Sequence, residues 1–160
     1  MIELKPMSAQ DFEAFEQISI ARYAADTLRT DGGTQASALD YARVSFAKLL
    51  PEREATPDHC LYTIRSVEHD AEVGTIWIGT ITHKQRRAAY VFDIHIDESW
   101  RRRGFATEAF RAVEAQVRER GLTEIALHVF GYNESAYALY RHLGYRPTHI
   151  SMVKSLTAEI

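Results

Sequence analysis

The sequence has little cysteine and little proline, with one Cys and four Pro in 160 residues. A single cysteine, Cys60, excludes an intrachain disulfide framework, and the first residues lack the charged-then-apolar order of a signal peptide. No apolar run approaches the ~20 residues that a membrane-spanning helix needs. We therefore expect a cytoplasmic protein that does not enter a membrane.

An excess of positive charge is also absent, because 19 Lys and Arg stand against 22 Asp and Glu, for a formal net charge of -3. The basic residues mostly alternate with acidic ones, which argues against a nucleic-acid partner and slightly favours cationic ligands. The composition, 46% hydrophobic and 26% charged, is that of a chain with a sizeable core. Without repeats or linkers, residues 1–160 are expected to form one domain.

The order of the predicted elements indicates a mixed α/β fold. Cap residues such as Ser8 and helical apolar spacing predict helices at about 8–31, 34–50, 104–121 and 133–143, with Phe12, Phe15 and Ile18 on the inward face of the first. β-branched and aromatic stretches predict strands at 2–7, 59–67, 72–82, 88–97 and 123–130, and one or two more within 145–156. The middle strands form an antiparallel meander, and the strand–helix–strand order after residue 88 implies a parallel crossover.

The stretch 101–106, Arg-Arg-Arg-Gly-Phe-Ala, joins a predicted strand to a predicted helix. The backbone N–H groups of a first helical turn have no partner within the helix, and the helix dipole adds partial positive charge there. Gly104 lets a ligand approach the backbone closely. The turn therefore predicts an anion site that suits a phosphate.

A second pattern follows about thirty residues later. It reads Asn133-x-x-Ala136-x-x-Leu139-Tyr140 and is followed by Leu143-Gly144-Tyr145. The two motifs together, over about residues 90–156, resemble the GNAT superfamily of acetyl-CoA-dependent N-acetyltransferases. The earlier helices and strands agree with that family only in their order.

The resemblance implies a mostly antiparallel sheet with a central parallel strand pair that splays apart, and helices on both faces. It implies that the pantetheine arm of acetyl-CoA lies in the splay, that Tyr140 is the general acid for the leaving thiolate, and that the acetyl group passes directly to a primary amine. The residues implied in cofactor binding are Ile94, His95, Ile96, Arg101, Arg102, Arg103, Gly104, Phe105, Ala106, Thr107 and Asn133.

Strand alternation places Asp93, His95 and Asp97 on one face of their strand. An amine must lose a proton to react, and Asp93 is our candidate for the base, with His95 and Glu72 as the other options. The same triplet also suits a metal-dependent hydrolase, although ligands two apart on a strand diverge by roughly 6–7 Å. The remaining histidines show no ligand clustering, so we expect no metal.

The acceptor amine has no signature in the sequence. A small cationic amine is slightly favoured over a protein amine because of the net negative charge. The main alternative is an acyl-CoA-binding sensor without turnover, and the metal-dependent hydrolase comes after it. For the oligomeric state, a homodimer is one of the options that the sequence leaves open.

Overall fold

The structure, a computed structural model, describes residues 1–157, with His83 described by its backbone alone. It has two compact units, Met1–Phe130 and Gly131–Ile160. Residues 158–160, the end of the predicted single domain, lie outside the described residues.

The first unit contains a sheet and three helices. Its elements are β1 (Ile2–Pro6), α1 (Ala9–Asp31), α2 (Gln35–Leu49), β2 (His59–Ser66), β3 (Ala71–His83), β4 (Arg86–Ile96), α3 (Phe105–Glu119) and β5 (Ile125–Leu127), with short 3-10 turns at Arg53–Ala55 and Glu98–Trp100. The predicted caps form as expected: Ser8 Oγ accepts from the Asp11 amide at 3.2 Å, and the Asp11 carboxylate accepts from the Ser8 amide at 2.9 Å.

The five strands lie in sequence order, β1-β2-β3-β4-β5. The first four pair antiparallel, and β4 pairs parallel with β5 through the α3 crossover. This confirms the predicted mixed α/β fold. The parallel pair, expected in the middle of the sheet, lies at its edge among the described residues.

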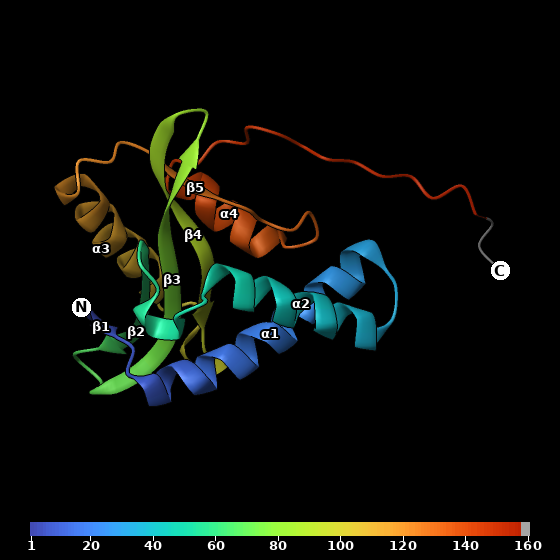
Figure 1. Cartoon of the computed structure of the whole chain (residues 1–160). Coiled ribbons are helices and arrows are strands. Elements are labelled where there is room, and N and C mark those ends of the chain that lie inside the picture. Colours follow the sequence, from blue (N-terminus) through green and yellow to red (C-terminus); the bar gives the residue numbers. More distant parts are fainter. Residues whose placement is uncertain (158–160) are drawn as a thin grey trace. The chain divides into compact units, whose positions relative to one another are not determined.

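Helices cover both faces of this sheet, α1 and α2 on one side and α3 on the other (Figure 1). Aromatic rings fill the space between the sheet and the helices α1 and α2. The ring centres of Phe46 and Phe15 lie 5.3 Å and 6.3 Å from that of Trp77. On the side of α3, Phe110 and Val113 are fully buried. One prediction for α1 is wrong, since Ile18 is 56% exposed.

The strand β4 changes its pairing partway along. Trp77 pairs with Asp93, and Ile78 pairs with Val91, so Phe92 is an unpaired extra residue that forms a β-bulge. The Phe92 ring stacks on the Trp77 ring, with the ring centres 4.7 Å apart. The ladder with β5 spans only Ala89–Val91, and the strand predicted at 123–130 is reduced to three residues. Because β5 ends at Leu127, opposite Val91, β4 has no strand partner on that side beyond Val91 among the described residues.

The second unit contains α4 (Glu134–His142). Asn133 caps it as predicted, its side-chain oxygen accepting from the Ala136 amide at 3.2 Å, and Gly144 ends it with φ 93°. The prediction of strands within 145–156 is wrong for this structure, where these described residues form none. Alternating apolar residues make a strand only where another strand satisfies their backbone groups, and no pairing reaches this segment.

Gly74 lies tightly against the neighbouring strand, because a Cβ atom there would lie 2.0 Å from the His95 carbonyl oxygen. We predict that Gly74→Ala forces β3 and β4 apart and lowers the free energy of unfolding by about 2–3 kcal/mol, as overpacking does. Urea denaturation followed by circular dichroism measures this change.

The matched control is Gly131→Ala, because nothing lies within 4 Å of a Cβ there. It should leave the unfolding midpoint in place. Equal midpoints for the two variants would contradict the close approach of β3 and β4.

Candidate functional site

The loop between β4 and α3 bends through left-handed conformations. Arg102 has φ 64° and Gly104 has φ 84°, and no side chain caps the start of α3. A non-glycine residue in this region costs of order 1–3 kcal/mol, which is typical of functional loops. The first-turn amides after Gly104 therefore remain available to an anion.

The arginines of this loop are exposed, and the loop's own contacts hold two of them. Arg101 Nε donates to the Ile96 carbonyl at 3.0 Å, and the Arg103 guanidinium lies 5.0 Å from the centre of the Trp100 ring. Trp100 is packed edge-on against His69 at 5.1 Å. His69 comes from the β2–β3 turn and is far from the loop in sequence, so the pattern at 101–106 gave no sign of this support.

The edge of β4 next to the loop is open. The Asp97 amide donates to the Val73 carbonyl at 2.9 Å, so its backbone faces β3. Backbone groups point alternately to the two sides of a strand, which turns those of Ile94 and Ile96 toward the side that β5 has left. Of the groups on this open edge, the Ile96 carbonyl is bonded by Arg101. An extended, amide-bearing ligand fits such an edge.

A cavity of about 190 Å³ lies between α1 and the strands β2, β3 and β4. From α1 it is lined by Asp11, Ile18 and Arg22, among others. From the strands it is lined by Glu72, Thr75, His95 and Asp97, among others. Ile18 is exposed because its side chain faces this space rather than the core.

Arg22, which lines this cavity, forms an ion pair with Asp93, which lies outside the lining. Arg22 Nη2 donates to the Asp93 carboxylate at 2.7 Å, with the two side chains 30% and 24% exposed. Burial raises the pKa of Asp93, and the adjacent Arg22 opposes that rise. No sequence signal linked Arg22 to Asp93, which lie 71 residues apart.

His95 lies beside this pair on β4. Burial lowers its pKa to about 4, and the nearby Arg22 and Arg101 act in the same direction while Asp97 opposes them. The imidazole is therefore neutral at physiological pH and can accept a proton. The Nε2 atom of His95 lies 3.6 Å from the Asp97 carboxylate, whereas Asp93 is bonded to Arg22. The three side chains of the triplet therefore do not converge on one point where a metal ion would bind. Within residues 1–157, no group of three or more His, Cys, Asp or Glu is placed to hold a metal.

The remaining predicted residues belong to the second unit. Asn133 caps α4, and the Tyr140 ring packs edge-on against Tyr145 at 5.9 Å. The structure thus brings Ile94, Ile96 and the arginine loop together within the first unit, and it describes Tyr140 and Asn133 within α4 and its cap.

Comparison with known proteins decides the family. A model of the acetyltransferase (GNAT) family matches residues 24–145, more than half of the chain. This chain belongs to the GNAT family. The match covers the open edge, the arginine loop, α4 and the strand side of the cavity, whereas the α1 residues that line the cavity lie before it.

Two relatives of this GNAT chain come from Bacillus subtilis and are both named as uncharacterized N-acetyltransferases. YycN is 29% identical over 97% of this chain and 99% of its own length, and YdgE is 27% identical over 96% and 97%. The crystal structure of YycN has a TM-score of 0.91, with 28% identity over 99% of this chain and 100% of that chain.

An acetyltransferase structure from Pyrococcus furiosus shares the fold, with a TM-score of 0.74 and 20% identity over 98% of this chain and 99% of that chain. In the part of the chain that the structure describes, no helix is both long and apolar enough to cross a bilayer.

A bulky residue at the left-handed position before α3 should damage the anion site. We predict that Gly104→Val weakens acetyl-CoA binding by at least tenfold, because a β-branched residue resists a φ of 84° and the first-turn amides reorient. Isothermal titration calorimetry measures the change.

Gly121→Val is the matched control, since Gly121 also has a positive φ, of 73°, but follows the far end of α3. It should strain the fold similarly and leave the affinity for acetyl-CoA in place. Equal losses of affinity in the two variants would contradict a specific role for Gly104.

Proposed function

We propose that this GNAT chain transfers the acetyl group of acetyl-CoA directly to a primary amine. One observation supports this most strongly: the open edge of β4 at Ile94 and Ile96 leads straight into the anion-binding loop at 101–106. A ligand that fits both must have an extended, peptide-like arm and a phosphate group. Acetyl-CoA, the cosubstrate of the GNAT family, has both.

In this proposal the backbone amides from Arg101 to Ala106, aided by Thr107, hold the pyrophosphate. The backbone of Ile94 and Ile96 holds the pantetheine arm, and Asn133 orders α4. Acetyl-CoA supplies an activated thioester, so no covalent bond to the protein is needed. Most of the rate then comes from holding amine and thioester in line and excluding bulk water.

Two proton transfers complete the reaction. A phenol can donate a proton to the departing thiolate, and we assign this role to Tyr140. The amine proton goes to a side chain on the face of β4 toward α1, where Asp93 and His95 both lie. A small cationic amine is favoured as the acceptor because the chain and its cavity are rich in carboxylates.

Removing one oxygen atom tests the role of Tyr140. We predict that Tyr140→Phe lowers kcat by about 100-fold, the usual size of a general-acid contribution, and leaves the acetyl-CoA affinity within about twofold. Thiol release in the presence of a panel of primary amines gives kcat, and calorimetry gives the affinity.

Tyr137→Phe is the control, because Tyr137 lies on the same helix and is 45% exposed. It should keep full activity. Acetyl-CoA binding without turnover of any amine, and no effect of Tyr140→Phe, would favour a sensor over an enzyme.

A further inference from the structure

The cavity beneath α1 and the open edge of β4 share one stretch of strand. His95 lines the cavity with its side chain, while Ile94 and Ile96 on either side of it turn their backbone groups to the open edge. If acetyl-CoA occupies the edge, as the proposed function requires, then the cavity is the space that reaches the thioester from the opposite side. This inference rests on that proposed function.

The shape of the cavity suits a small, partly apolar molecule. Its volume of about 190 Å³ is roughly six times the ~30 Å³ that a water molecule occupies in the liquid. Ala14, Phe15 and Ile18 give it an apolar wall on α1.

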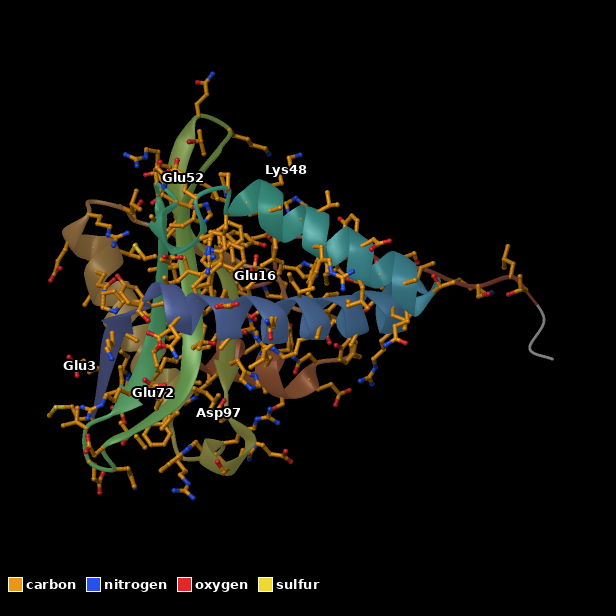
Figure 2. The ribbon with its side chains drawn as sticks, turned by 60° about the horizontal axis from the view of Figure 1, so that its bottom comes forward. Glu3, Glu16, Lys48, Glu52, Glu72 and Asp97 are labelled. Atoms are coloured by element: carbon orange, nitrogen blue, oxygen red, sulfur yellow. The ribbon has the colours of Figure 1, made fainter. Side chains whose placement is uncertain are left out.

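The charges around the cavity are unbalanced. Among the described residues that line it, three are carboxylates, Asp11 on α1, Glu72 on β3 and Asp97 directly after β4, and one is a cation, Arg22. The charge of Arg22 is compensated by Asp93, which is not one of these three carboxylates. Figure 2 shows Glu72 and Asp97 on the same side of α1, and the bond from the Asp97 amide to Val73 places them at neighbouring positions on the two strands.

Of the side chains that line the cavity, His95 is best placed to receive a proton. The close approach of Gly74 fixes its backbone against β3. Asp93 lies outside the lining and has its carboxylate bonded to Arg22, whereas Glu72 and Asp97 are exposed. A weakly basic imidazole is sufficient, because the N–H protons of the amine become acidic once its nitrogen has bonded to the carbonyl carbon.

We propose that this cavity is the acceptor site, that it takes a short aliphatic diamine, and that His95 accepts the proton of the reacting nitrogen. The second amino group stays protonated among Asp11, Glu72 and Asp97. The nitrogen lone pair forms the new C–N bond, and the C–S bond breaks with its electron pair going to sulfur. The thiolate takes one proton from Tyr140, the reacting nitrogen loses one proton through His95 to water, and Tyr140 regains its proton from water, so that the products are the N-acetyl diamine and CoA thiol.

Three amines that differ only in their far end test the charge requirement. In 1,4-diaminobutane, butylamine and 4-aminobutanoate, the same chain ends in a positive, a neutral and a negative group. We expect kcat/KM for acetylation to fall in that order, by roughly tenfold per step. Mass spectrometry of the products and thiol release measure both parameters.

Two variants separate the two parts of the proposal. Glu72→Gln should raise KM for 1,4-diaminobutane several-fold and flatten the series, whereas the control Glu13→Gln, on an exposed part of α1 outside the cavity, should leave it unchanged. His95→Gln should lower kcat by about 100-fold for all three amines, with their order and the acetyl-CoA affinity kept.

The outcomes that overturn this inference differ from those that overturn the proposed function. Equal kcat/KM for the three amines, a preference for 4-aminobutanoate, or a preference for a lysine-containing peptide over 1,4-diaminobutane would exclude the diamine site and leave an acetyltransferase. Unchanged kcat in His95→Gln would exclude His95 as the proton acceptor. Acetyl-CoA binding without acetylation of any amine would exclude both proposals.

Discussion

The feature on which the rest of this structure depends is the interrupted pairing of β4. On one side, β4 pairs with β3 as far as Ile96, the last residue of β4. On the other side, its pairing with β5 stops at Val91, and the bulge at Phe92 follows directly. Backbone groups that lose a partner must find another or stay accessible to a ligand, because burying them unpaired costs about 1–3 kcal/mol each. The open edge, the bulge and the loop after Ile96 follow one another along a single strand.

Each neighbour of β4 keeps it in this state. Phe92 is held by stacking on Trp77, which the aromatic rings of α1 and α2 enclose, and Gly74 lets the end of the strand lie close to β3. After the end of β4, the contact between the rings of His69 and Trp100 joins the β2–β3 turn to the arginine loop. The open edge of β4, the arginine loop and the acidic cavity therefore all adjoin the end of one strand in the first unit.

The sequence predicted what depends on local chemistry. The caps at Ser8 and Asn133 and the strand–loop–helix order could be predicted because a few adjacent residues determine each of them. The family could be identified for the same reason, since its motifs are short.

The misses depend on tertiary contacts. The pairing of Arg22 with Asp93 joins residues from α1 and β4, and the exposure of Ile18 follows from a cavity that no spacing along one helix could reveal. The strands expected within 145–156 need a partner strand, and apolar alternation alone does not supply one. The cavity itself could not be predicted, because its lining comes from α1 and three strands.

Hydrogen exchange with and without acetyl-CoA tests the central claim most directly. If acetyl-CoA fills the open edge of β4, the amides of Ile94 and Ile96 and those of residues 104–106 should exchange more slowly in its presence, while the amides of β1 at the far edge of the sheet should not change. Acetyl-CoA that binds without protecting Ile94 and Ile96, or that protects β1 instead, would contradict the account.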